Sequence, residues 1–194
     1  MPFGSSQWMY SSGFYPTEID QSLMFDGTAY LSRTPSVAGN RKTWTFSTWV
    51  KLGKIGTAST LFSSGADGSN KTEFTFRADG RFQLFSNTSG IPVGSIVWSP
   101  NVYRDPSAWY HLSLVCDTTN ATNTNRFRFY VNGVQVTGIS GTGGENTWPS
   151  QNADLHISTN VAHSTGRLQN NASDYFNGYM ADTYFVDGTA LDPT

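Results

Sequence analysis

The feature that most constrains the fold is a hairpin encoded by residues 109–136. Large apolar side chains recur at every second position in both of its arms. They are Tyr110, Leu112, Leu114 and Cys116 in the first arm, and Phe127, Phe129 and Val131 in the second. A period of two predicts strands, because successive side chains of a strand point to opposite faces. Asn132 and Gly133 then predict a type I′ turn, which needs two positive φ angles, and residues 134–136 return as a further short strand.

The rest of the chain also reads as short strands separated by polar, glycine-rich turns. We expect strands at residues 22–25, 28–32, 44–51, 60–63, 72–78, 81–86, 154–159 and 175–186. Asp26-Gly27 and Asp79-Gly80 each predict a tight hairpin between the strands that flank them. No segment has the apolar period of 3.6 residues that a helix requires. The pattern therefore predicts an all-β domain, a sandwich or a barrel, over residues 22–194.

Composition excludes several classes of partner. Charged residues make up 13% of the chain and the net charge is -2, so there is no basic surface for nucleic acid or anionic lipid. No apolar run reaches the length that spans a bilayer, and the N-terminus lacks the pattern of a signal peptide. The one cysteine, Cys116, lies at an inward strand position and predicts a small core residue in a protein that folds in a reducing cytoplasm.

Residues 1–21 differ from the rest and form what we call the N-terminal arm. The arm contains almost no charge, several glycines, prolines and serines, and a set of large rings. The rings are Phe3, Trp8, Tyr10, Phe14 and Tyr15. Such rings are costly to leave in water, so the arm either folds back on its own domain or docks on a neighbouring subunit.

Five landmarks in fixed order resemble the laminin-G-like, concanavalin A-like domains. They are Ser22-Leu-Met-Phe-Asp-Gly-Thr-Ala-Tyr-Leu, Trp44-Thr-Phe-Ser-Thr-Trp-Val-Lys, Trp109-Tyr-His-Leu, Phe129-Tyr-Val-Asn-Gly-Val and Phe176-Asn-Gly-Tyr-Met-Ala-Asp-Thr-Tyr-Phe-Val-Asp-Gly-Thr-Ala-Leu. The order and the spacing match over residues 22–192. The resemblance implies a two-sheet antiparallel jelly-roll sandwich.

A narrower resemblance is to bacteriophage virion proteins that carry this domain. It rests on Phe3-Gly-Ser-Ser-Gln-Trp-Met-Tyr, Tyr30-Leu-Ser-Arg-Thr-Pro-Ser, Gly39-Asn-Arg-Lys-Thr-Trp-Thr and Tyr184-Phe-Val-Asp-Gly-Thr-Ala-Leu-Asp-Pro. The resemblance implies a virion component assembled in the host cytoplasm, with other capsid or tail proteins as partners. We also expect a homo-oligomer.

Hydrolysis of glycans needs two carboxyl groups on either side of one sugar ring. The glucanase branch of the superfamily places them as Glu-x-Asp-x-Glu on one strand face. The three glutamates here are Glu18, Glu73 and Glu145, and none has an acidic residue two positions away. The sequence therefore argues against that mechanism, and no catalytic residue is assigned.

Metal sites are equally weakly indicated. The three histidines, His111, His156 and His163, have no zinc-ligand spacing, and we expect His111 to pack against a neighbouring strand. Some relatives bind calcium at a loop rim, and Asp67, Asp105, Asp117 and Asp174 lie in or beside loops. Each of these aspartates is more simply a turn or cap residue, so no cofactor is assigned and calcium stays an alternative.

The remaining candidates for ligand binding are aromatic rings with amide neighbours. Trp49 lies out of phase with Trp44, Phe46 and Val50, so it faces outward if these three face the core. We take Trp49, Trp98, Trp148 and Asn146 as candidate sugar contacts, since a ring offers a stacking face and an amide offers hydrogen bonds. The alternative is that these rings fill the core or a subunit interface.

Three functions follow from these observations. The first is a non-catalytic virion structural protein, a capsid decoration or head-fibre unit with weak glycan binding, whose N-terminal arm docks on the particle. The second is a tail-fibre module that binds host surface glycans. The third, a glycoside hydrolase, is disfavoured by the missing carboxylates.

Overall fold

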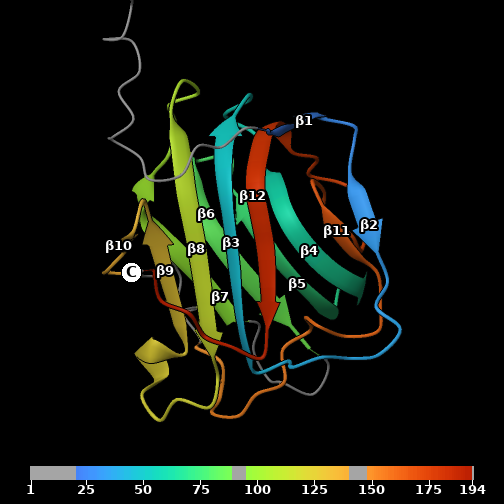
Figure 1. Cartoon of the computed structure of the whole chain (residues 1–194), viewed down its shortest axis with the longest axis vertical. Helices are drawn as coiled ribbons and strands as arrows, with labels where there is room; N and C mark the ends of the chain where they lie inside the picture. The colour runs from blue at the N-terminus through green and yellow to red at the C-terminus, as the bar shows by residue number, and fades with distance from the viewer. Residues whose placement is uncertain (1–20, 89–94, 140–147, 194) are drawn as a thin grey trace, which may run out of the picture.

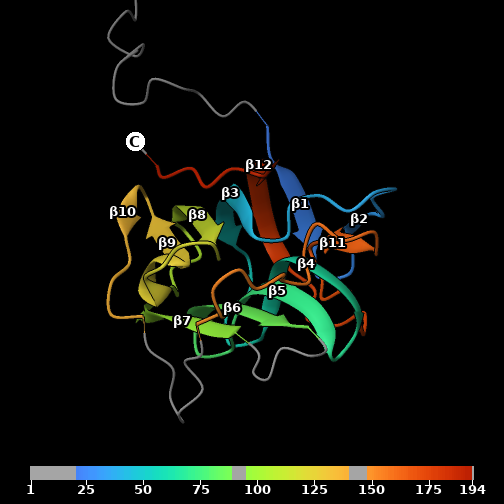
Figure 2. The same ribbon diagram turned by 90° about the horizontal axis from the view of Figure 1, so that it is seen from below.

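The computed structural model of the chain describes residues 21–88, 95–139 and 148–193, and for residues 95–98 it describes the backbone alone. Two antiparallel sheets of six strands each face one another in this part of the chain (Figures 1 and 2). An all-β, two-sheet sandwich was the expectation, and it is confirmed. The N-terminal arm, apart from residue 21, lies outside the described residues.

Sheet A has the order β1-β12-β3-β8-β9-β10. Its strands are β1 (Leu23–Asp26), β12 (Asn177–Asp187), β3 (Thr43–Leu52), β8 (Trp109–Asp117), β9 (Phe127–Val131) and β10 (Val134–Gln135). Sheet B has the order β2-β11-β4-β5-β6-β7. Its strands are β2 (Leu31–Arg33), β11 (His163–Thr165), β4 (Ser59–Asp67), β5 (Asn70–Phe76), β6 (Arg81–Asn87) and β7 (Ser95–Val102). The described residues also include one short 3-10 helix, η2 (Asn123–Asn125).

Two of the predicted hairpins are confirmed. Strands β8 and β9 pair from Leu112↔Val131 to Cys116↔Phe127, and Asn132 and Gly133 have φ angles of 51° and 77°. Both values are positive, as a type I′ turn requires. Strands β5 and β6 pair across the turn that contains Asp79 and Gly80, and Gly80 has a φ of 80°.

The core consists mainly of rings contributed by the inner faces of both sheets. Trp44 of β3 is fully buried and stacks on Phe74 of β5, with ring centroids 5.5 Å apart. Phe82 of β6 stacks on Phe129 of β9 at 4.6 Å. Each such pair adds about 0.5–1.5 kcal/mol to what burial of the rings already contributes. Cys116 is fully buried among them, as expected of a core residue.

The predicted hairpin at Asp26-Gly27 is wrong. Strand β1 pairs with β12 in sheet A, whereas β2 pairs with β11 in sheet B, so the chain crosses between sheets here. Asp26 Oδ1 accepts hydrogen bonds from the backbone N–H groups of Thr28 and Ala29, both at 2.8 Å. A side chain that caps the turn in this way leads the chain out of the sheet instead of folding it back.

The predicted strand at residues 154–159 is also wrong. This segment is a series of bends, and its polar members are buried with the apolar ones: His156 and Ser158 are each 8% exposed. Strand β11 lies instead at His163–Thr165, within a stretch that reads as a polar loop. Ser158 has a φ of 52°, which ends any extended run at that point.

The outer face of sheet A is covered in part by a C-terminal strap, residues 188–193, which runs from the end of β12 across β3 and β8 toward β9 (Figures 1 and 2). Thr45 Oγ1 donates to Thr189 O at 2.9 Å and accepts from Leu191 N–H at 2.8 Å. Tyr130 Oη donates to Asp192 Oδ1 at 2.8 Å. The strap explains why Thr45 and Tyr130 are buried although they lie outside the sandwich core.

Candidate functional site

The structure separates the residues that the sequence offers as ligand contacts. Trp49 lies on the outer face of sheet A, in β3. Trp148 is partly buried and packs against the core. Trp98 lies in β7, where its backbone pairs with Gln83 and its side chain is outside the description, as is the whole of Asn146. Of the four, Trp49 alone is placed on an outward sheet face by the described side chains.

Trp49 belongs to a group of rings on three neighbouring strands that we call the aromatic platform. Its members are Trp49, Trp109, His111, Tyr179 and Tyr184. All occupy outward positions, because the residues that alternate with Trp49 in β3 are buried in the core. Tyr184, Tyr179 and Trp109 are 59%, 38% and 37% exposed, which is unusual for rings of this size.

Two pairs of platform rings contact each other across the strands. Trp109 and Tyr179 have centroids 6.4 Å apart with planes tilted by 55°. Trp49 and His111 are 5.0 Å apart. Lys51 stands between Tyr179 and Trp109 in the register. The result is an apolar surface with one cationic side chain inside it.

A β-bulge in β12 decides which ring joins the platform. Asp182 and Thr183 together lie opposite Thr48, so β12 contains one extra residue between Ala181 and Tyr184. Asp182 has a φ of 45°. The extra residue reverses the alternation, turning Tyr184 outward and Phe185 inward, against the core. Without it, simple alternation from Tyr179 would place Phe185 on the outside.

Polar groups lie beside the platform rings. Ser47 Oγ is 2.9 Å from His111 Nε2, and Asn132 Oδ1 accepts the backbone N–H of His111 at 2.9 Å. Burial lowers the pKa of His111, which favours the neutral ring at pH 7. His111 thus packs against the adjacent strand, as expected from the sequence.

A second concave feature, the edge cavity, opens between the two sheets at the side where β12 approaches β11 and β2. Its volume is about 470 Å³. It is lined by Leu31, Ser32, Arg33, Pro35, Val37, Gly39, Phe62, Ser158, His163, Thr165, Phe185 and Asp187. Strand β1 pairs with residues 177–180 of β12 and not with its end, so β12 forms the edge of sheet A along Tyr184–Asp187.

The edge cavity has an aromatic floor and polar walls. Phe62 and Phe185 stack with centroids 5.6 Å apart, and Phe62 contacts the His163 ring at 5.9 Å. Asp187 Oδ1 accepts from Asn40 N–H at 2.9 Å and from Ser158 Oγ at 3.2 Å. No sequence signal pointed to this cavity, because β2 and β11 are three residues long and lie far apart in the chain.

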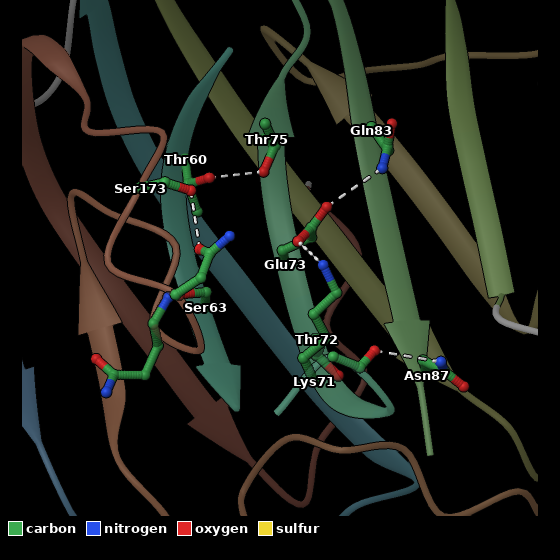
Figure 3. A network of polar contacts seen from close by, with 12 residues as sticks. Thr60, Ser63, Lys71, Thr72, Glu73, Thr75, Gln83, Asn87 and Ser173 are labelled. Atoms are coloured by element: carbon green, nitrogen blue, oxygen red, sulfur yellow. Dashed lines mark hydrogen bonds and ion pairs between the residues drawn. The ribbon is translucent and has the colours of Figure 1, made fainter. Parts of the chain in front are cut away.

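The outer face of sheet B carries a set of polar contacts between neighbouring strands (Figure 3). Glu73 is 8% exposed; its Oε2 accepts from Lys71 Nζ at 2.9 Å and its Oε1 from Gln83 Nε2 at 3.4 Å. Thr60 and Thr75 hydroxyls bond to each other at 2.9 Å. Both oxygens of Glu73 are engaged, and the network continues from Gln83 through Arg77 to the carboxylate of Asp79.

The aspartates considered for calcium are turn residues. Asp67, Asp105 and Asp117 each accept the backbone N–H two positions ahead, at 2.8–3.0 Å. The backbone carbonyl of Asp174 accepts from Thr60 N–H. In the parts of the chain that the structure describes, no three His, Cys, Asp or Glu side chains come together as a metal site. Nor does any helix among these residues have the length and hydropathy to cross a membrane.

Comparison with known proteins identifies the fold family. Residues 25–193 match the family described as the concanavalin A-like lectin/glucanases superfamily. A search of curated proteins found no match.

Solved structures give the same fold at low sequence identity. Domain 4 of AbnA, an arabinanase from Geobacillus stearothermophilus, is 17% identical, with a TM-score of 0.61 over 88% of this chain and 72% of that one. The Ruminococcus gnavus sialidase module CBM40 is 15% identical, with a TM-score of 0.54 over 79% and 91%. Domains LG4-5 of mouse laminin alpha1 are 12% identical, with a TM-score of 0.58 over 91% and 48%. With two six-stranded sheets and a match over nearly its whole described length, the chain belongs to the concanavalin A-like lectin/glucanase superfamily.

Proposed function

We propose that this domain binds glycans without cleaving them and that the aromatic platform is the binding surface. The observation that carries the proposal is the group of exposed rings on adjacent strands, with hydrogen-bonding groups beside them. A sugar ring presents an apolar C–H face to an aromatic ring and hydroxyl groups at its rim, so it matches such a surface.

Two relatives support this class of ligand. The similar domain of the arabinanase AbnA was solved in complex with arabinotriose, and the similar module CBM40 was solved bound to sialyllactose. The platform is broad and carries Lys51 as its one cation, which favours an extended, weakly charged chain of sugars over a polyanion.

The test uses a matched pair of exposed tyrosines. Tyr184→Ala removes a ring from the platform, whereas Tyr30→Ala removes a ring that is 43% exposed beside β2, in the other sheet. We expect the unaltered protein to bind members of a panel of soluble polysaccharides in calorimetry, Tyr184→Ala to weaken binding about tenfold, and Tyr30→Ala to leave it unchanged. Equal affinities for the two variants would refute the platform as the site.

A second function, a structural component of a bacteriophage particle, is proposed on separate grounds. The landmarks shared with virion proteins suggest it, and an exposed apolar side chain of β1 favours it: Met24 is 58% exposed. The aromatic N-terminal arm directly precedes β1 in the sequence. Here the arm docks on a capsid or tail protein or on a second copy of the chain, and the platform faces outward as a glycan contact.

Deleting residues 2–21 tests this second function. We expect the shortened protein to keep its fold by circular dichroism but to be missing from purified particles, as measured by mass spectrometry. Incorporation at the normal level would rule out the arm as the docking element.

A further inference from the structure

One buried hydrogen-bonding atom of His163, a residue that lines the edge cavity, has no partner in the part of the chain that the structure describes. His163 is 8% exposed, and its Nδ1 lies 2.8 Å from the carbonyl oxygen of Val161. Because a carbonyl only accepts, Nδ1 carries the proton, and in the neutral ring Nε2 is then an acceptor. Nε2 is buried and unbonded in the part of the chain that the structure describes. An unsatisfied buried acceptor destabilises the folded protein, and a ligand that donates a hydrogen bond to it would remove that cost.

We propose that the edge cavity is a second binding site, separate from the aromatic platform, and that it takes a single neutral sugar ring. The ring would lie on the Phe62 and Phe185 floor and donate a hydroxyl hydrogen to His163 Nε2. The source of the ring is either a free monosaccharide or the terminal residue of a longer glycan, since both present the same chemistry.

The walls of the cavity select this ligand class. Arg33 supplies donors on one side, and the Asp187 carboxylate supplies an acceptor on the other. Their charges oppose each other, so the lining favours a neutral ligand with both hydroxyl donors and acceptors over an anion or a cation. The volume of about 470 Å³ lies within the range of roughly 300–1,000 Å³ that small-molecule sites occupy.

The aspartate wall is held in place by the backbone around it. A Cβ at Gly39 would lie 2.1 Å from Asp187 Oδ2, so only glycine allows the carboxylate to stand there. Gly39 N–H also bonds to Ser158 O at 2.7 Å, which ties the loop of Ser158 to the cavity wall. These contacts fix the position of the acceptor before any ligand arrives.

The two sites use opposite faces of the same strand, so they can be tested separately. Tyr184 points out to the platform, whereas Phe185 points in to the cavity. The cavity proposal does not require the platform to bind glycans, and failure of either leaves the other standing.

The experiment follows the imidazole nitrogen resonances of the full chain, which contains three histidines, by NMR. Free glucose, galactose, mannose and arabinose are titrated at pH 7.5, together with their methyl glycosides and a short oligosaccharide of each. We expect a saturable shift of His163 Nε2 with a dissociation constant of about 1 mM, as suits a ligand of about twelve non-hydrogen atoms.

A blocking variant and a matched control accompany the titration. Val37→Trp fills the mouth of the cavity from a position that is 76% exposed, and Val134→Trp adds the same ring on β10 at a position that is 71% exposed. Val37→Trp should weaken binding at least tenfold, and Val134→Trp should not change it. His163→Phe keeps a ring but removes the acceptor, and it should also abolish the sugar-dependent shifts of the Phe185 ring.

Each outcome either tests the proposed site or identifies where its sugar ring comes from. Binding of free sugars alone supports a free monosaccharide, whereas equal binding of methyl glycosides and oligosaccharides supports a chain end. No saturable His163 shift up to about 100 mM sugar, far above the expected constant, would overturn the proposal. A shift of the same size in Val37→Trp would overturn it as well. Tyr184→Ala should leave the His163 shift caused by free monosaccharides unchanged.

Discussion

The three histidines, two buried and His111 partly buried, are the groups of this domain that titrate nearest neutral pH. Burial is the main cause that lowers the pKa of His111, His156 and His163, and Arg41 and Arg33 add to it for the last two. Since an unfolded histidine has a pKa of about 6.5, the unfolded chain takes up these protons first as the pH falls. The histidine contribution to stability is therefore full above about pH 7 and is lost as the pH falls through the unfolded pKa toward the lowered folded values.

We expect the urea midpoint of unfolding to be lower at pH 5.5 than at pH 7.5. The aspartates whose pKa is lowered by turn hydrogen bonds, such as Asp26 and Asp105, titrate below about pH 4 and stay charged across this window. Fluorescence-monitored urea titrations at the two pH values measure the difference. A midpoint that is equal or higher at pH 5.5 would contradict it.

Gly178 is the residue where a single methyl group should cost most. Its φ is 146°, and a Cβ there would lie 2.2 Å from the backbone oxygen of Lys51 and 2.8 Å from the backbone N of Gly53. Backbone atoms of a paired strand cannot move aside, so we expect Gly178→Ala to lower the free energy of unfolding by about 2–4 kcal/mol.

Gly188→Ala is the matched control in the same urea titration. Gly188 has a φ of 80° but nothing within 4 Å of its Cβ position, so the substitution should cost only the strain of a positive φ, about 1–2 kcal/mol. Equal losses for the two variants would show that the contact at Gly178 relaxes.

At the scale of strands, periodicity predicted the elements that pair locally. The β8–β9 and β5–β6 pairs have strong alternation, and short turns with glycine at positive φ join β5 to β6 and β9 to β10, so pairing and register in these strands follow from the sequence. Trp49 was placed outward by the same rule. The rule fails where a short segment joins a strand far away, as β11 joins β2 and β4, because nothing local marks which extended segments find a partner.

The two sites differ in how far the sequence could reveal them. Trp49 and Trp109 follow from alternation in β3 and β8, but Tyr184 reaches the platform through a bulge that no residue type announces. The cavity brings together His163, Arg33 and Asp187 only because β11, β2 and β12, which are distant in the sequence, lie at the same side of the sandwich. Long-range topology of this kind is set by the whole core and not by any one segment.

The C-terminal strap is an element without regular structure that nevertheless covers a sheet face. Ending the chain after Gly188 would expose Thr45, Val115 and Tyr130, which are all buried. We expect this truncation to lower the free energy of unfolding by about 2–3 kcal/mol in urea titrations, the value of one large side chain returned to water.

A charge variant distinguishes two contributions of the strap to stability: the burial of side chains beneath it and its ion pair with Arg128. Asp192→Asn removes the contact to Arg128 Nε at 2.9 Å, where the aspartate side chain is 53% exposed. A pair this exposed contributes no more than about 1 kcal/mol, so Asp192→Asn should cost less than the truncation. Equal costs would assign the stabilisation to the ion pair.

At the scale of the molecule, the first and last strands are neighbours. Strand β12 lies between β1 and β3, so the sheet is continuous only when the last strand is in place. A chain that ends at residue 174 lacks β12 and leaves Phe25 and Trp44 beside an empty strand position. We expect it to have no cooperative thermal transition by calorimetry, whereas the chain ending at Gly188 should retain one; a cooperative transition in the shorter chain would contradict this.

The position of β12 between β1 and β3 also affects folding during synthesis, because β12 is made much later than the two strands that it joins. A ribosome releases β1 and β3 long before it makes the strand that joins them, so in a nascent chain the facing edges of β1 and β3 stay unpaired until β12 emerges. On a polysome, β12 of one copy can pair with the unpaired edges of β1 and β3 in a neighbouring copy as well as with those of its own chain. Expression yield should therefore depend on translation density, because crowded messages favour strand exchange between copies over closure within one chain.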